Sequence, residues 1–340
     1  MKILERRFID FDCPSQFPKR KPQSVHAASV EFLEDDEPYF ACFGGIREGT
    51  PDVAIYVHHK GKNIIIGAED DIPRWNPILF NLNEKLYLIE KKGLFCDRWQ
   101  TQIHDLTNVD FSKGISWKSN IINIPAGLNA AVKTKPIIVN GLIYCGSSVE
   151  TMWDWTSYVE VYSDLFDYKF RSKPLTVAKK RYTSFCGTQN LTQGIIQPSL
   201  WYDGVKMHAF FRSSKGLGYI YHSVCDSDDQ LTGQYFNGWS KPKATELENP
   251  NSGIDTVFYK DRLFLVYNPN KFVRMPLMVS QLDSNSFAVE DSLEVTKAAS
   301  VEDGILTGEL SYPYMVERDG KLHLVYTYGR TKIEYVVIEI

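Results

Sequence analysis

The 340-residue sequence lacks a hydrophobic run long enough to cross a membrane, and its first residues, MKILERRFIDFD, are too polar for a secretory signal. It also lacks an excess of either charge, because 38 Lys and Arg residues stand against 42 Asp and Glu residues, a net charge of −4. Without a basic stripe or tail, nucleic acid and anionic membranes are not expected as main partners. These absences predict a soluble, cytoplasmic protein.

Clustered cysteines and cofactor motifs are missing as well. The six cysteines stand singly, with no CxxC pair and no histidine at zinc-finger spacing; they are Cys13, Cys42, Cys96, Cys145, Cys186 and Cys225. Reduced thiols are the favoured interpretation, and a secreted disulfide scaffold is the alternative. No glycine-rich phosphate loop, HExxH or GxSxG occurs, so neither a metal nor an organic cofactor is predicted.

Helical periodicity is almost absent, and strand-length runs of Val, Ile, Tyr and Phe between turn residues take its place. Six of these runs begin with a similar phrase, in which a polar residue, usually followed by Pro or a small residue, leads into an apolar strand. The copies are His26-Ala-Ala-Ser-Val, Asn76-Pro-Ile-Leu-Phe, Lys135-Pro-Ile-Ile-Val, Gln197-Pro-Ser-Leu-Trp, Gly253-Ile-Asp-Thr-Val-Phe and Tyr312-Pro-Tyr-Met-Val. Each copy runs into a turn and then a second apolar strand.

Repeats spaced by roughly fifty to sixty residues, with three or four strands each, are typical of propeller blades. The repeat therefore predicts an all-β chain, a six-bladed β-propeller forming one domain over residues 1–340. The strand at residues 5–11 has no local partner, and we expect it to pair in the last blade beside residues 333–340 and to close the ring. A pair of β-sandwiches is the alternative, but it would not explain the repeated phrase.

In a propeller, equivalent positions of successive blades form a ring at one mouth. The first predicted ring is His26, Asn76, Lys135, Gln197, Asp255 and Tyr312. A second ring is expected from the ends of the second strands, namely Arg47, Asp52, Glu90, Glu150, Arg212, Asn268 and Arg330. Cations, carboxylates, amides and a tyrosine in one pocket indicate a polar, anionic small molecule or sugar.

The chain resembles the sialidase (neuraminidase) superfamily, and more closely its bacterial branch of BNR-repeat proteins. The matching stretches are His26-Ala-Ala, Phe43-Gly-Gly-Ile-Arg-Glu-Gly-Thr-Pro-Asp-Val-Ala-Ile, Trp75-Asn-Pro-Ile-Leu-Phe, Lys133-Thr-Lys-Pro, Ile196-Gln-Pro-Ser-Leu, Phe211-Arg-Ser, Asn249-Pro-Asn-Ser-Gly-Ile-Asp and Glu309-Leu-Ser-Tyr-Pro. The resemblance implies a six-bladed propeller. The Asp-box motif that usually marks the turns of such blades is degenerate in this sequence, and its best match is Ser227-Asp-Asp-Gln with Trp239.

The resemblance also implies roles for individual residues. Asp52 matches the general acid/base and Tyr312 the nucleophile, while Arg212 and Arg274 match two of the three arginines that hold the substrate carboxylate. A phenol suits attack beside a carboxylate, because it carries less charge than a carboxylate nucleophile would.

Two positions depart from this pattern. His26 stands where the first arginine is expected, and Gln197 stands where a glutamate would activate the tyrosine. An amide cannot take a proton, so Glu309 is the candidate replacement for the base. Lys135 or Arg330 is the candidate replacement for the missing cation, and Arg47, Arg212, Arg274 and Lys135 would bind the anion.

The leading functional hypothesis is a glycosidase of sialidase type that removes a terminal acidic sugar from a glycan. A polysaccharide lyase is a second hypothesis, in which His26 or Tyr312 abstracts the proton next to a uronate carboxylate. A carbohydrate-binding propeller without catalytic activity is the third, because fold alone does not assign function. The three hypotheses predict different outcomes with a glycan: hydrolysis for the glycosidase, elimination for the lyase, and binding without turnover for the carbohydrate-binding propeller.

Overall fold

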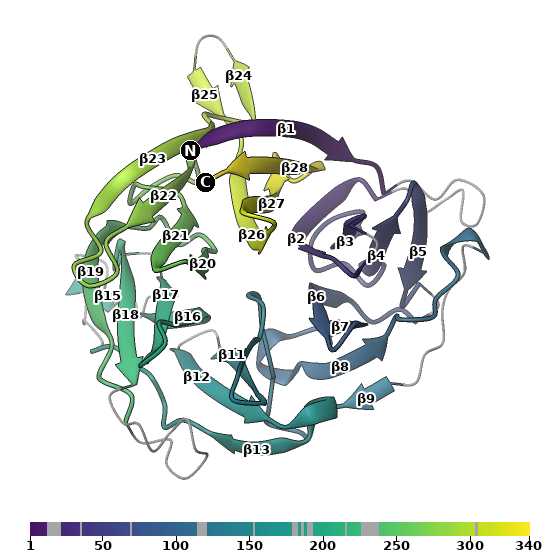
Figure 1. Ribbon diagram of the computed structural model, residues 1–340, viewed down its shortest axis with the longest axis horizontal. Coiled ribbons are helices and arrows are strands. Elements are labelled where there is room, and N and C mark those ends of the chain that lie inside the picture. Colours follow the sequence, from purple (N-terminus) through teal and green to yellow (C-terminus); the bar gives the residue numbers. More distant parts are fainter. Residues whose placement is uncertain are drawn as a thin grey trace. The chain divides into compact units, whose positions relative to one another are not determined.

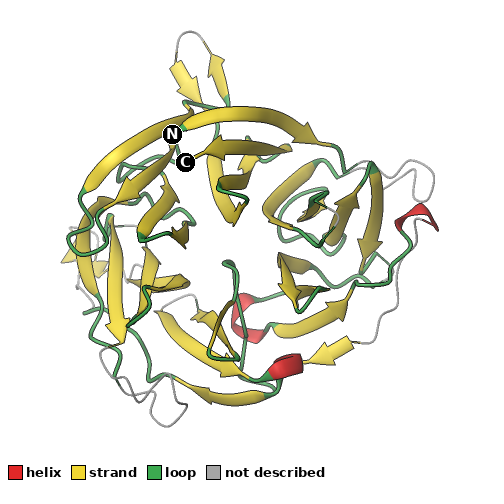
Figure 2. Cartoon of the chain, in the orientation of Figure 1, coloured by secondary structure: helices red, strands yellow, loops and turns green. Residues whose placement is uncertain are grey.

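The computed structural model describes residues 1–11, 22–34, 36–68, 70–113, 121–151, 154–178, 183–184, 187–188, 193–214, 216–225, 238–302 and 305–340. Cys13, Cys186 and the Asp-box remnant at Ser227 lie outside these ranges. Strands make up nearly all the regular structure of the described residues, as Figure 2 shows. The helical elements among them are the 3₁₀ turns η1 (Cys96–Arg98), η2 (Phe111–Lys113) and η3 (Asp164–Phe166). The all-β class is therefore confirmed.

The chain folds into two compact units, the first made of residues 1–129 with 293–340 and the second of residues 130–292. The prediction that residues 1–340 form a single domain stays a prediction.

The first unit contains three four-stranded antiparallel sheets and a two-stranded ribbon. The strands of each sheet are given in their order of pairing. One sheet consists of β1 (Lys2–Ile9), β28 (Lys332–Glu339), β27 (Lys321–Tyr328) and β26 (Leu310–Arg318). A second consists of β2 (Ser24–Glu31), β3 (Tyr39–Gly45), β4 (Ala54–His59) and β5 (Lys62–Ile66), and a third of β6 (Arg74–Leu82), β7 (Lys85–Lys92), β8 (Gln100–Asp105) and β9 (Ile121–Asn123). The ribbon is β24 (Ser300–Glu302) with β25 (Ile305–Thr307). The N-terminal strand does lie beside β28, as Figure 1 shows.

The second unit contains an eight-stranded sheet, a four-stranded sheet and a ribbon. The eight-stranded sheet comprises β10 (Ile137–Val139), β11 (Leu142–Glu150), β12 (Asp154–Tyr162), β13 (Tyr168–Arg171), β16 (Gln193–Tyr202), β17 (Met207–Ser213), β18 (Tyr219–Cys225) and β19 (Lys243–Glu248). The four-stranded sheet is β20 (Asp255–Tyr259), β21 (Arg262–Tyr267), β22 (Leu277–Leu282) and β23 (Val289–Thr296), and the ribbon is β14 (Thr183–Ser184) with β15 (Gly187–Thr188). The boundary between the units falls within β23.

The prediction of six separate blades is wrong. Among the described residues there are four separate four-stranded sheets, and β10–β13 and β16–β19 are joined into one sheet instead of two. The junction is a short parallel pairing of β12 with β16, with Asp154 opposite Gln193 and Trp155 opposite Gly194. A Cβ atom on Gly194 would lie 2.2 Å from the Trp155 carbonyl oxygen, so this close approach requires glycine.

The repeated phrase forms a β-bulge in four of its copies. The register between first and second strand shifts after Trp75, Ile196 and Ser311, and the next residue has a left-handed backbone: φ is 46° at Asn76, 54° at Gln197 and 51° at Tyr312. In the first copy, Ala27 has φ 50° directly after His26. Ala27, and not His26, is therefore the counterpart of Tyr312, which corrects the sequence alignment by one residue. Left-handed residues other than glycine are strained and concentrate at functional sites.

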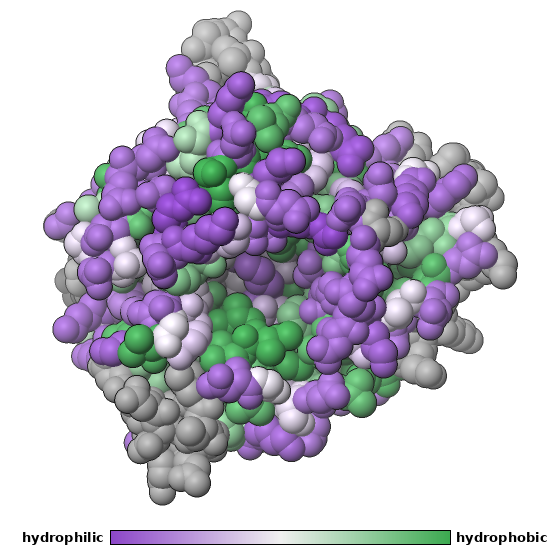
Figure 3. Space-filling view, viewed as in Figure 1, coloured by the Kyte–Doolittle hydropathy of each residue, from purple (hydrophilic) through white to green (hydrophobic). Residues whose placement is uncertain are grey.

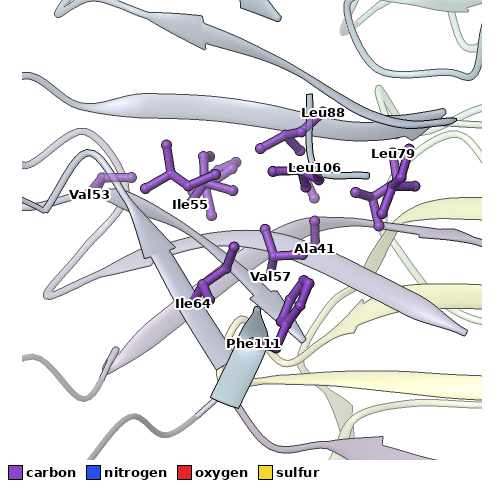
Figure 4. Close-up of a cluster of buried hydrophobic side chains, with 13 residues drawn as sticks. Ala41, Val53, Ile55, Val57, Ile64, Leu79, Leu88, Leu106 and Phe111 are labelled. Carbon is purple, nitrogen blue, oxygen red and sulfur yellow. The ribbon is translucent and has the colours of Figure 1, made fainter. Parts of the chain in front are cut away.

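Each unit has its own hydrophobic core. In the first unit, alternate residues of neighbouring strands belong to one cluster, including Leu86 and Leu88 of β7. Ile55 and Val57 of β4 lie in the same cluster with Leu88 (Figure 4). This period of two is the alternation of side chains across a strand, and the opposite faces of β4 and β7 are buried as well. Hydrophilic side chains predominate on the face in Figure 3, with hydrophobic ones between them.

Candidate functional site

Tyr312 occupies the bulge of β26 and is partly buried against the core of the first unit. Its ring packs against the imidazole of His26, with 4.2 Å between ring centroids and a tilt of 51°. His26 is only 1% exposed, and Phe43 contacts it edge-on at 5.6 Å. The phenol is therefore held between solvent and a buried imidazole.

Glu309 is the charged residue that contacts both His26 of this ring pair and the more exposed Arg330. Its Oε1 lies 4.0 Å from Nδ1 of His26, accepts a hydrogen bond from Ser311 Oγ at 2.6 Å, and pairs with Nε of Arg330 at 2.9 Å. Arg330 also pairs with Glu48. Burial lowers the pKa of Arg330, but the carboxylates of Glu309 and Glu48 outweigh this effect and raise it above its ordinary value. The guanidinium therefore remains charged between two carboxylates.

Asp52 and Arg47 lie on the loop between β3 and β4, the same loop that carries Glu48. The Asp52 carboxylate accepts a hydrogen bond from the backbone N–H of Ile46 at 2.7 Å, and the Thr50 hydroxyl donates one to the Arg47 carbonyl at 2.6 Å. Asp52 is partly exposed and Arg47 is exposed. The loop is thus internally braced, and through Glu48 it contacts Arg330 of the Tyr312 group.

Asn76 is 95% buried in the bulge of β6, and the residues beside it form a charged group of which the sequence predicted only Glu90. Arg74, 5% exposed, pairs with the fully buried Glu90, whose Oε1 is also 2.8 Å from Nε2 of His104. A Cβ atom on Gly67 would lie 1.7 Å from Arg74 Nε, so the close packing of Arg74 requires glycine there. No feature of the sequence marked Arg74 or His104.

In the second unit, Gln197 and Arg212 are brought together. Nη1 of Arg212 donates to the Gln197 side-chain oxygen at 3.0 Å, and Nε donates to the Asn251 side-chain oxygen at 2.9 Å. The guanidinium also lies over the ring of Trp155, 5.6 Å from its centroid. Arg274 donates to the backbone carbonyl of Asn251 at 2.9 Å. One residue, Asn251, therefore orients both predicted carboxylate-binding arginines, a role that sequence reasoning missed.

Lys135 and Asp255 form an ion pair in the same unit. Nζ of Lys135 is 2.9 Å from the Asp255 carboxylate, whose other oxygen accepts a hydrogen bond from Ser199 Oγ at 2.9 Å. Lys133, two residues before Lys135, is buried, and its pKa falls to about 8. Burial is the main cause, opposed by Asp255 and reinforced by the positive charges of Lys135 and Arg212. Lys133 begins one of the stretches that carry the family resemblance, but the sequence analysis gave it no role in the site.

Two groups of predicted residues are thus assembled, one in each unit. The first unit brings together His26, Tyr312, Glu309 and Arg330, and the second brings together Gln197 with Arg212 and Lys135 with Asp255. That all of them line one pocket stays a prediction. Within the described residues, no cluster of three His, Cys, Asp or Glu side chains is arranged to hold a metal ion. None of the described helices has the length and hydrophobicity needed to cross a membrane.

Solved structures with a similar fold include glycosidases. A protein of unknown function from Dyadobacter fermentans matches with a TM-score of 0.71 at 13% identity, over 100% of this chain and 99% of its own. A sialidase from Trypanosoma rangeli in complex with the inhibitor DANA matches with a TM-score of 0.62 at 11% identity, over 94% of this chain. This chain spans only 55% of that sialidase. An α-L-arabinanase from Penicillium chrysogenum, complexed with arabinobiose, matches with a TM-score of 0.61 at 10% identity, over 100% of this chain and 99% of its own.

These identities are low, so the likeness establishes a propeller-like fold and not an activity. No curated protein is similar enough in sequence to be matched. The model of the BNR repeat-like domain family, however, matches residues 38–324, which is most of the sequence. The chain therefore belongs to the BNR repeat-like domain family.

Proposed function

We propose that the protein is a glycoside hydrolase of sialidase type that releases a terminal acidic sugar. Its family and the glycosidases among similar folds support the class of reaction. The observation that carries the proposal is Tyr312, a partly exposed phenol in a strained bulge, packed on His26 with Glu309 beside it. An ordinary surface tyrosine has no need of such surroundings.

In the proposed reaction Glu309 takes the hydroxyl proton of Tyr312, and the Tyr312 oxygen attacks the anomeric carbon while the glycosidic C–O bond breaks; Glu309 returns the proton when the Tyr312–sugar bond is later cleaved. Asp52 gives its proton to the leaving oxygen, and it then accepts a proton from the water that cleaves the Tyr312–sugar bond. Partial exposure suits this role, because Asp52 must reach both a leaving group and a water molecule. Its contact with the Ile46 N–H keeps the carboxyl on the braced loop.

The second unit supports the acidic character of the sugar. Lys133 feels the charges of Asp255, Lys135 and Arg212, and Lys135 pairs with Asp255. Arg274 joins Arg212 through Asn251, so this group contains four cations and the Asp255 carboxylate. The guanidinium groups are preorganised by Asn251 and Gln197, which reduces the cost of ordering them on binding. A carboxylate-bearing sugar is the ligand that such a group of cations recognises best.

The test is turnover of fluorogenic glycosides of sialic acid, glucuronic acid and arabinofuranose. We expect hydrolysis of an acidic glycoside by the parent and none by Tyr312→Phe, with both proteins equally stable. No turnover of any acidic glycoside would contradict the proposal, and turnover of the arabinoside alone would point to a neutral substrate.

Binding of an acidic sugar without turnover is a second candidate function. The observation that favours it is Gln197, whose side-chain oxygen accepts a hydrogen bond from Arg212 and which cannot act as a base. Calorimetry with free sialic and glucuronic acids distinguishes the candidates: this one requires a measurable affinity together with no hydrolysis by the parent.

A further inference from the structure

Arg330 joins two segments of the first unit that carry proposed catalytic residues. Its Nε lies 2.9 Å from Oε1 of Glu309, the proposed base, and its Nη1 pairs with Glu48 on the β3–β4 loop. That loop also carries Asp52, whose carboxylate accepts a hydrogen bond from the Ile46 N–H at 2.7 Å. One guanidinium therefore contacts both the base and the loop of the acid/base.

The backbone that carries Arg330 is held in a strained conformation. Its φ is 57°, which is unfavourable for a residue with a side chain. The Arg330 carbonyl oxygen accepts a hydrogen bond from the Val25 N–H at 2.9 Å, and the neighbouring Gly329 N–H donates to the Glu309 carbonyl at 2.8 Å. The turn between β27 and β28 is thus tied to Glu309 through both backbone and side chain, so the direction of the guanidinium is fixed in advance.

A second arginine bridge joins the same two sheets at the other end of their strands. Arg318, at the end of β26, pairs with Asp36 in the β2–β3 loop, and its guanidinium lies 5.0 Å from the ring centroid of Phe32. The pairing of β26 with β27 places Arg330 at the end of β26 that carries Tyr312, and Arg318 at the opposite end. The two arginine side chains are similarly exposed, at 36% and 26%. Arg318 is therefore a control for simple stabilisation of the contact between these sheets.

We infer that Arg330 is a positioning residue, which holds Glu309 and the Asp52 loop in one arrangement beside Tyr312. A planar guanidinium can direct separate hydrogen bonds at two carboxylates, whereas an ammonium acts as a point charge without a fixed geometry. Both carboxylates belong to the protein, so this role does not require Arg330 to bind the substrate. The inference rests on the proposed function for the roles of Glu309 and Asp52.

The first experiment needs no substrate. It measures hydrogen–deuterium exchange of the backbone amides of residues 46–52 in the parent, Arg330→Gln, Glu48→Gln and the control Arg318→Gln. Removing either side of the Glu48–Arg330 pair should raise the exchange rate of this loop by at least about threefold, because the loop opens more often. Arg318→Gln should leave the rate at the parent value. Unchanged exchange in a folded Arg330→Gln, or an equal rise in Arg318→Gln, would overturn the inference; if Arg330→Gln does not fold, Glu48→Gln decides.

The second experiment is steady-state kinetics with an acidic glycoside that the parent hydrolyses. Arg330→Gln should lower kcat by at least about tenfold and leave KM within about threefold, because misplaced catalytic groups slow the chemistry without weakening binding. Arg330→Lys should recover part of this loss. The double variant Glu48→Gln/Arg330→Gln should lose less than the product of the two single losses, because both changes break the same bridge. Arg318→Gln should keep the parent kcat.

A raised KM with an unchanged kcat in Arg330→Gln would make Arg330 a substrate ligand and contradict the inference. A parent that hydrolyses no acidic glycoside would refute the proposed function, whereas the exchange measurement would still decide whether Arg330 holds the loop. The two failures are therefore distinguishable.

Discussion

The two units contain charged groups of opposite character. The group around Tyr312 in the first unit holds one guanidinium between two carboxylates, next to an imidazole and a phenol. The group around Arg212 in the second unit holds two guanidiniums and two ammoniums with one carboxylate. The first has the proton-carrying side chains that a reaction needs, and the second has the cations that an anion needs.

Under the proposed function, the group in the first unit carries out the chemistry and the group in the second unit recognises the anion. Removing a group from the first unit should reduce turnover and leave anion affinity nearly unchanged, whereas removing one from the second should reduce affinity. Non-additive effects would indicate that the two groups act on one ligand.

The largest expected effect is the loss of turnover in Tyr312→Phe. Removing a nucleophile should lower kcat by at least about 10³-fold, with the Kd for a free acidic sugar within about threefold of the parent. Steady-state kinetics and calorimetry check the two halves. Tyr39→Phe, at another stacked tyrosine, is the control and should leave both values unchanged.

Arg212→Lys should weaken binding of the acidic sugar by about 30- to 1,000-fold. Lysine cannot reproduce two directed hydrogen bonds, to Gln197 and Asn251, and leaves the buried Gln197 oxygen and the half-buried Asn251 oxygen poorly satisfied. Calorimetry measures the change, and Arg262→Lys on β21 of the same unit is the matched control. An unchanged affinity in Arg212→Lys would remove the second unit from the proposed recognition.

His323 should make the first unit sensitive to acid. Its pKa falls to about 4, chiefly because burial disfavours the imidazolium and also because Lys321 and Arg318 repel it. The unfolded chain binds this proton more readily, so stability is lost as the pH falls from about 6.5 to 4, by up to about 3 kcal/mol. Urea denaturation of His323→Phe should show a smaller loss over this range. An identical loss in the variant would show that another group is responsible.

The smallest expected effect concerns Lys133 in the second unit. Because its pKa is about 8, anion affinity should fall by up to about tenfold as the pH rises through that value and the cation is lost. Lys133→Met should bind more weakly at about pH 7 and show a flatter profile. The exposed Lys260→Met is the control. A decline that persists in Lys133→Met would assign the titration elsewhere.

Much of the local structure could be predicted from the sequence. Alternating Val, Ile, Tyr and Phe between turn residues gave the strands, and the N-terminal strand was correctly expected beside the C-terminal one. The count of blades failed, because the joining of β12 to β16 depends on a close contact between Trp155 and Gly194 that no repeat marks. The bulge was missed too, since a register shift is a property of two paired strands and not of one.

The residue types of the candidate site could also be predicted from the sequence, whereas the residues that contact them in the fold could not. A repeated phrase selected Tyr312, Gln197 and Asp255 because strand periodicity and turn chemistry act over a few residues. Their surroundings come from far along the chain: Glu48 and Arg330, which flank the phenol group, are 282 residues apart. Only tertiary packing could bury His26 under Tyr312 and set Gln197 against Arg212, because charges and rings interact through space and not along the sequence.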